Sequence, residues 1–252
     1  MARKRIKISF FMKKNNKGFS LLEILVAMAL VALIFSMVAN FNFTSKQASE
    51  ELIDDLTLAI DSATDEAALR NSNIRINFEL SDPKLENKDE VSIEDQTQSI
   101  LFEYALDSNE LLEVTERANR SDLTQTQLEK FIENQKSQKS NYARLSSLKN
   151  GKINVEYPVK ILGIGYPNDN KFISTLSSSI YFYPDGDKDP AIVFITEGQQ
   201  IHYLVIPQFG LNIKYDSVLI ESSSTELDFE ELIEKARTRA KELFEKIRLE
   251  TN

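Results

Sequence analysis

The chain has 252 residues, which is enough for one or two domains with a buried core. Its formal charge is −9, but the first 18 residues hold seven basic side chains and no acid, so the rest sets 23 basic against 39 acidic side chains, a balance of −16. Such an acidic chain repels phosphate backbones, which argues against nucleic acid as a partner, and the absence of cysteine excludes disulfides, thiolate metal sites and cysteine nucleophiles.

A basic leader, residues 1–18, is followed by a long apolar run, FSLLEILVAMALVALIFSMVA, Phe19 to Ala39. Its 21 residues rise about 1.5 Å each in a helix and span roughly 30 Å, the thickness of a bilayer's hydrocarbon core. A secretory signal would have an apolar stretch of only about 7–15 residues and a small-residue cleavage site, which VANFNF does not provide. We therefore expect one retained span of a bacterial inner membrane at residues 19–39. The positive-inside bias places the leader in the cytoplasm and the remainder in the periplasm.

Glu23 is a lone carboxylate inside this apolar run. An ionised carboxylate at membrane depth is costly unless it is paired, protonated or able to reach the headgroups, and reaching the headgroups is the simplest interpretation. The string KGFSLLE, Lys17 to Glu23, however, resembles the leader and cleavage junction of type IV prepilins and type II secretion pseudopilins. The resemblance implies that a membrane-embedded prepilin peptidase cuts between Gly18 and Phe19 and methylates the new amine of Phe19.

The same resemblance makes Glu23 the fifth residue of the mature chain and gives it a role in filament assembly. Its carboxylate is the natural partner for the new ammonium of a neighbouring subunit as the helices bundle. The implied partners are prepilin peptidase, other pilins or pseudopilins through the N-terminal helix, and the inner-membrane assembly platform. Asn40 stands near the position where many major subunits of this family carry a helix-kinking proline, which disfavours a major subunit.

Beyond the apolar run the helical pattern continues to about Arg70. No Gly or Pro occurs between Phe19 and Asp82, and apolar residues recur at helical spacing. We expect one helix whose first half, residues 19–39, lies in the membrane. Its second half, residues 40–70, is the predicted spine of a globular head.

Residues 71–222 have the period of strands. NIRINFEL, from Asn73, predicts a half-buried strand, and SILFEYAL, from Ser99, predicts another. Strand signals return at Lys152 and continue to Tyr215 as a compact meander with turns at PDGDKDP, EGQQ and PQFG. The meander and the first strand resemble the head of the H-type minor pseudopilin of type II secretion and its pilus counterparts. The predicted fold is therefore α+β, a long N-terminal helix packed on a C-terminal antiparallel β-sheet.

Two further segments have a helical character. Residues 108–150 are polar with apolar residues at near-helical spacing, which predicts one or two surface helices inserted into the sheet, with partial disorder as the alternative. Residues 223–252 predict an amphipathic C-terminal helix with one apolar stripe. We expect that stripe to dock onto its own head; a groove on a neighbouring subunit or another secretion component is the alternative.

Catalysis is not expected from this sequence. His202 is the one histidine, in an alternating strand where it faces either core or solvent, and no Ser or Cys nucleophile motif accompanies it. GIG, at Gly163 to Gly165, lacks the rest of a phosphate-binding loop.

The string DGDKD is the one metal-like cluster. Asp185, Asp187 and Asp189 copy the start of a calcium loop, and some major pseudopilins of the resembled family bind calcium in a C-terminal loop. Pro190 and Thr196 stand where that loop needs its turn glycine and its bidentate glutamate. We interpret the segment as a solvated hairpin tip with calcium as the weaker alternative, and expect no other cofactor.

These features predict a minor pseudopilin, a non-catalytic subunit that prepilin peptidase processes and that joins a short periplasmic filament for protein export. A minor pilin of a type IV pilus is the second interpretation, although DNA uptake fits poorly with so acidic a chain. The competing class is a stand-alone, signal-anchored periplasmic binding module, which prepilin peptidase would not shorten.

Overall fold

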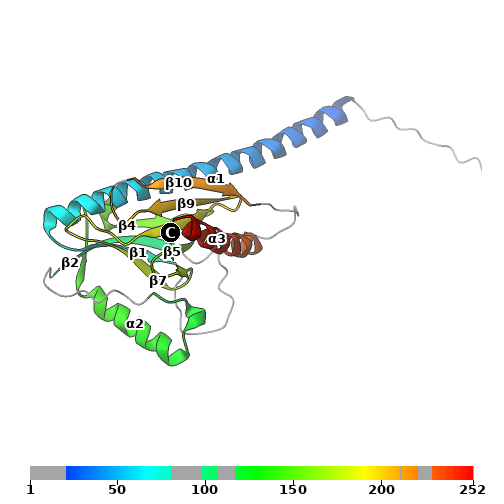
Figure 1. Ribbon diagram of the computed structural model, residues 1–252. Coiled ribbons are helices and arrows are strands. Elements are labelled where there is room, and N and C mark those ends of the chain that lie inside the picture. The colour runs from blue at the N-terminus through cyan, green and yellow to red at the C-terminus, as the bar shows by residue number, and fades with distance from the viewer. Residues whose placement is uncertain (1–20, 81–97, 107–116, 211, 221–228, 252) are drawn as a thin grey trace, which may run out of the picture. The chain divides into compact units, whose positions relative to one another are not determined.

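The computed structural model describes residues 21–80, 98–106, 117–210, 212–220 and 229–251. The chain divides into two compact units, Met1–Phe43 and Thr44–Asn252. Among the described residues, the first unit contributes only the start of helix α1, and the second holds every other element (Figure 1). The predicted leader, residues 1–18, lies outside the described residues.

Helix α1 (Leu21–Arg70) ends where the sequence places the end of the N-terminal helix. Its stop has a local cause: Asn71 adopts a left-handed conformation with φ 49°, which asparagine tolerates better than most residues. The Ser72 N–H then donates to the carbonyl of Ala67 at 3.2 Å, and the Ser72 hydroxyl donates to the carbonyl of Ala105 at 2.9 Å. The end of α1 is thereby tied to the strands that follow.

Within the described ranges, ten strands form two antiparallel sheets of five. Sheet A has the order β3-β2-β1-β7, with β4 also paired to β2; its strands are β1 (Ile74–Glu79), β2 (Gln98–Ala105), β3 (Tyr142–Arg144), β4 (Lys152–Val155) and β7 (Ser177–Phe182). Sheet B has the order β10-β9-β8-β5-β6; its strands are β5 (Lys160–Tyr166), β6 (Lys171–Ile173), β8 (Ala191–Thr196), β9 (Gln200–Ile206) and β10 (Lys214–Leu219).

The largest hydrophobic core joins α1 to one face of each sheet. Leu56 and Ile60 of α1 are 0% and 1% exposed, and they belong to the same cluster as Ile76 of sheet A and Val193 of sheet B. Burial of such side chains is the main favourable term in folding, at about 25 cal/mol per Å² of apolar surface. The Thr44–Arg70 part of α1 is therefore the predicted spine of the head.

Helix α3 (Phe229–Thr251) covers the other face of sheet B. Alternation along β8 separates the two cores: Val193 packs in the cluster with α1, whereas Ile192 and Phe194 pack with Ala236 and Phe244 of α3. The docking of the C-terminal stripe onto its own head is confirmed. Because both faces of sheet B are covered, the strand AIVFIT is apolar at nearly every position.

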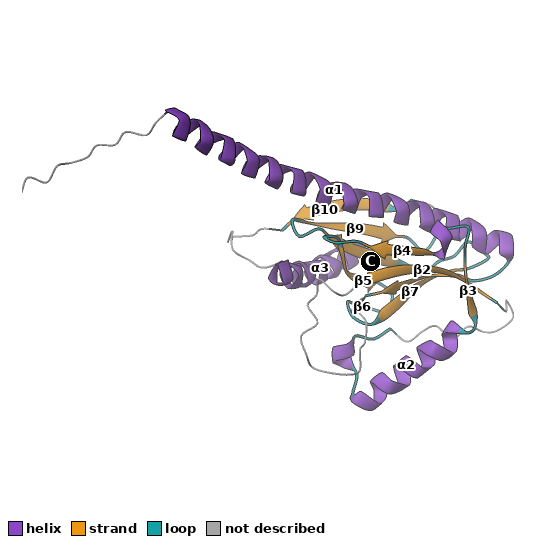
Figure 2. Cartoon of the chain, turned by 180° about the vertical axis from the view of Figure 1, so that it is seen from behind, coloured by secondary structure: helices purple, strands orange, loops and turns teal. Residues whose placement is uncertain are grey.

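The polar insertion forms α2 (Gln125–Lys139), the 3-10 turns Arg120–Asp122 and Lys149–Gly151, and the short strand β3, which the sequence did not predict. α2 lies on the side of the strands opposite to the Thr44–Arg70 part of α1 (Figure 2). It buries Leu128 and Phe131, and its last turn lies beside Arg75 and Asn77 of β1.

The prediction that β1 is half-buried was wrong. Arg75 and Asn77, expected to face solvent, are only 3% and 6% exposed. The Arg75 Nε donates to Glu103 Oε2 at 2.7 Å, and the Ser179 hydroxyl donates to Asn77 Oδ1 at 3.1 Å, so both polar side chains have partners under α2.

The predicted single meander was also wrong, because β7 pairs with β1 in sheet A while β8 pairs with β5 and β9 in sheet B. The PDGDKDP segment forms a local hairpin turn, with an antiparallel bridge between Phe182 and Lys188, and the chain then crosses from sheet A to sheet B. Pro184 and Pro190 flank this crossing, and a residue without an N–H cannot continue a ladder of strand hydrogen bonds.

Candidate functional site

Of the three residues that the sequence assigns to processing and assembly, the structure describes Glu23. Gly18 and Phe19 lie outside the described residues. Glu23 is an exposed acidic side chain in the first turn of α1. It lines a shallow hollow along one helix face with Ile24, Ala27, Met28, Val31 and Ala32, and together they form adjacent pairs that recur every four residues.

The described side chains around Glu23 form an exposed apolar surface. Their exposed fractions run from 49% at Ile24 to 78% at Leu21, and the other members are Leu22, Leu25, Val26, Met28, Leu30, Val31, Leu33, Ile34 and Phe35. A contiguous apolar surface of this kind marks a site of contact with protein or lipid. Within the part of the chain that the structure describes, no helix is both long and apolar enough to cross a membrane.

Residues 13–39 match the model of the prokaryotic N-terminal methylation motif. This motif indicates a type IV pilin-like protein. The matched range contains the junction Gly18–Phe19 and the carboxylate of Glu23, and it supports the pilin and pseudopilin superfamily. For a pilin-like protein it implies processing by prepilin peptidase and assembly with other pilins. No curated protein and no solved structure matches the chain.

His202 lies in the core of the head. It is 1% exposed; its Nε2 lies 2.9 Å from Glu197 Oε2 and 3.5 Å from Ser49 Oγ, and its Nδ1 lies 2.8 Å from Tyr215 Oη. In a catalytic triad the acid and the nucleophile bond opposite ring nitrogens, whereas here both approach Nε2. Ser49 is 0% exposed and donates to the carbonyl of Lys46 at 2.9 Å. This arrangement ties α1 to β9 and β10.

Two carboxylates of the DGDKD segment, those of Asp185 and Asp189, accept hydrogen bonds from other groups of the protein. The Asp187 N–H donates to Asp185 Oδ1 at 3.1 Å, and Asp189 accepts hydrogen bonds from Arg117 Nη2 and, at 3.3 Å, from Tyr183 Oη. Among the described residues, no three His, Asp or Glu side chains are grouped so that they could hold a metal ion. The segment is therefore an anchored connection in this structure.

Arg117 holds the DGDKD segment in place through Asp189, a role that the sequence did not predict. Its guanidinium lies 3.7 Å from the ring centroid of Tyr166 and also donates to Asp169 Oδ2 at 2.6 Å. Burial alone would lower the pKa of Arg117, but Tyr166, Asp189 and Asp169 outweigh it and the pKa is raised. One arginine thus joins the segment before α2 to two loops, and a single Arg in a polar stretch carries no pattern that predicts this.

Lys188 fixes the other side of the crossing. It is 2% exposed and its Nζ donates to the carbonyl of Gly210, which lies in the turn between β9 and β10. Burial lowers the pKa of Lys188, and Asp61 of α1 opposes that shift. The two sheets and the spine helix therefore meet at this connection.

The GIG string has a packing role in β5. A side-chain carbon at Gly165 would lie 2.6 Å from Cε2 of Phe244, and one at Gly163 would lie 2.8 Å from the carbonyl oxygen of Ile173. Real Cβ atoms do not approach other atoms this closely. The two glycines allow α3 and β6 to approach the strand.

Proposed function

We propose that this chain is a non-catalytic subunit of a pilus-like filament. Prepilin peptidase removes residues 1–18 by cutting between Gly18 and Phe19, and Phe19 becomes the methylated first residue. The observation that carries the proposal is the N-terminal methylation motif over residues 13–39.

The exposed surface of α1 supports assembly through this helix. Its apolar side chains, 49% to 78% exposed, offer a face for neighbouring helices and for lipid. Glu23 then supplies a negative charge within that face, where a freshly made N-terminal ammonium of a neighbour is its complement.

We further propose a minor pseudopilin of type II secretion, anchored once in a bacterial inner membrane with its head in the periplasm. Support comes from the resemblance of the head to the H-type minor pseudopilin and from Asn40 in place of a kinking proline. A minor pilin of a type IV pilus is the second candidate, and it rests on the same motif. Deleting the gene separates the two, because loss of protein export with normal surface pili supports the first role and the converse supports the second.

Replacing Glu23 with alanine tests the assembly role. We expect cleavage and methylation to remain largely intact, while incorporation into filaments falls at least about tenfold, because truncating one partner of a desolvated charge pair costs about 2–5 kcal/mol. The measurement is the ratio of mature to precursor chain on a blot, together with the fraction of mature chain that sediments with filaments. Asp54→Ala, an exposed carboxylate elsewhere on α1, is the matched control and should assemble normally. Normal co-assembly of Glu23→Ala would refute the role.

A further inference from the structure

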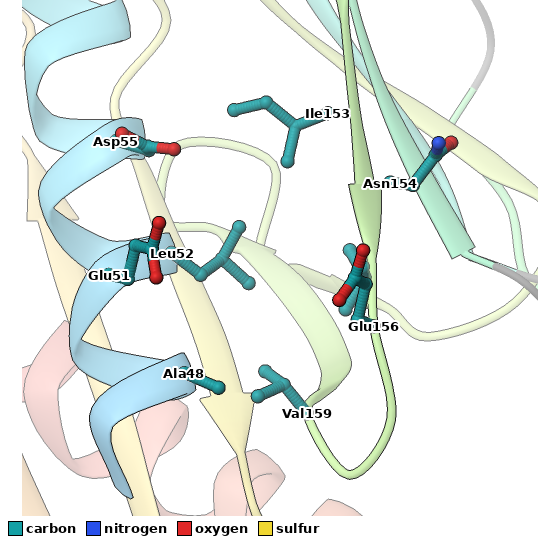
Figure 3. Close-up of a pocket in the computed structure, with 9 residues that line it drawn as sticks. Ala48, Glu51, Leu52, Asp55, Ile153, Asn154, Glu156 and Val159 are labelled. Carbon is teal, nitrogen blue, oxygen red and sulfur yellow. The ribbon is translucent and has the colours of Figure 1, made fainter. Parts of the chain in front are cut away.

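A groove lies between α1 and the end of β4, within the second unit (Figure 3). Its volume is about 210 Å³. We call it the α1–β4 groove, and it is lined by Ala48, Glu51, Leu52 and Asp55 of α1 and by Ile153, Asn154, Val155, Glu156 and Val159 across from them.

The groove has an apolar floor and a charged rim. Leu52, Val155 and Val159 are 7%, 6% and 3% exposed and close its base, and in Figure 3 Leu52 points from the helix into the space beside Val159. Glu51 and Glu156 are exposed and stand on opposite walls. An aliphatic stem with a charged end fits such a shape, because the stem covers the floor while the charge stays at the rim.

The groove is smaller than most pockets for small molecules, so its size favours a single side chain as the occupant. Pockets for such ligands are usually about 300–1,000 Å³, and the α1–β4 groove has about 210 Å³. At about 30 Å³ for each water, it has room for roughly seven waters. That space suits one long side chain.

The charged residues that line the groove are all acidic, which favours a basic side chain as the ligand. Asp55 Oδ1 already binds Lys149 Nζ at 2.8 Å, at the edge of the groove. Among the described residues, no Lys or Arg forms an ion pair with Glu51 or Glu156. The carboxylates of Glu51 and Glu156 therefore leave two negative charges on facing walls of the groove. The ion pair between Asp55 and Lys149 shows that a lysine ammonium binds a carboxylate at this edge.

We propose that the α1–β4 groove binds a lysine side chain of an adjacent subunit, an inference that rests on the proposed function. A lysine ammonium has three freely rotating donors, which suits separate carboxylates on two walls, whereas the guanidinium fork of arginine prefers one carboxylate. The groove begins at Ala48, soon after the apolar run that the proposed function assigns to assembly. Because that run is the proposed contact with neighbouring subunits, we take a neighbouring subunit to be the partner of the groove.

Zero-length carbodiimide cross-linking of assembled filaments, followed by mass spectrometry of peptides, tests the inference. The wild-type chain should give amide cross-links between Glu51 or Glu156 and a lysine of another polypeptide. The double variant Glu51→Gln/Glu156→Gln should lose these cross-links and enter filaments about three- to tenfold less, because a few exposed charge pairs are removed. Both residues are exposed, so its melting temperature should be unchanged. Asp54→Asn, on the same helix outside the groove, should keep the cross-links and the wild-type incorporation.

The results separate this inference from the proposed function. Filaments that contain the wild-type chain, with Glu51 and Glu156 linked only to its own Lys149 or to nothing, would overturn the groove inference alone. A wild-type chain that is unprocessed and absent from filaments would overturn the groove inference together with the proposed function.

Discussion

Gly165→Val is expected to displace α3 from sheet B and to lower the stability of the head by about 3 kcal/mol. Phe244 is 0% exposed and its ring lies where the new side chain would be, with Cε2 2.6 Å from the position of an added Cβ. The ring has to leave its site, and Leu162 and Phe194 of the sheet then lose their cover. Thermal unfolding of the full-length chain should show a melting temperature roughly 6–12 °C lower, since 1 kcal/mol corresponds to about 2–4 °C at this size.

A second substitution shows whether Phe244 is the obstacle. Phe244→Ala alone should cost about 3–5 kcal/mol because it leaves a cavity. Gly165→Val added to Phe244→Ala should cost little more, since the valine then fills part of that cavity. Additive losses would mean that the glycine serves another purpose.

Arg75→Leu is expected to destabilise the head by about 3–5 kcal/mol, because it leaves the carboxylate of Glu103 buried without its cation. The Arg75 and Glu103 side chains are 4% and 9% exposed and are joined at 2.7 Å. The guanidinium also lies 3.6 Å from the ring centroid of Tyr142. Chemical denaturation, followed by circular dichroism, measures the loss.

Two comparisons make this result specific. Arg75→Leu/Glu103→Leu should recover most of the stability, because no lone charge remains under α2. Arg239→Leu breaks a pair with Glu242 whose side chains are 53% and 60% exposed, and it should cost less than about 1 kcal/mol. Equal losses for the single and double variants at Arg75 would contradict the account.

The sequence predicts those parts of the fold that local pattern controls. Apolar residues at helical spacing predict the helix that ends at Arg70, and short apolar runs between turns predict the strands. The C-terminal stripe predicts a docked helix because a row of apolar side chains needs a cover. The junction Gly18–Phe19 and Glu23 lie in one contiguous motif, so the sequence alone is enough to predict their roles.

The remaining features depend on partners distant in the chain. Nothing near Phe182 indicates that β7 joins β1 while β8 joins β5, so one sheet was predicted where there are two. Arg75 has the pattern of an exposed residue, and only its pairing with Glu103 beneath α2 explains its burial. The α1–β4 groove joins Glu51 to Glu156, residues whose proximity no local pattern can reveal.

The mass of the N-terminal peptide, from the chain purified out of its native membrane, tests the central claim most directly. The account predicts a mature chain that begins at Phe19 and carries one added methyl group on its amine. A chain that still begins at Met1, with Phe19 unmodified, would contradict it.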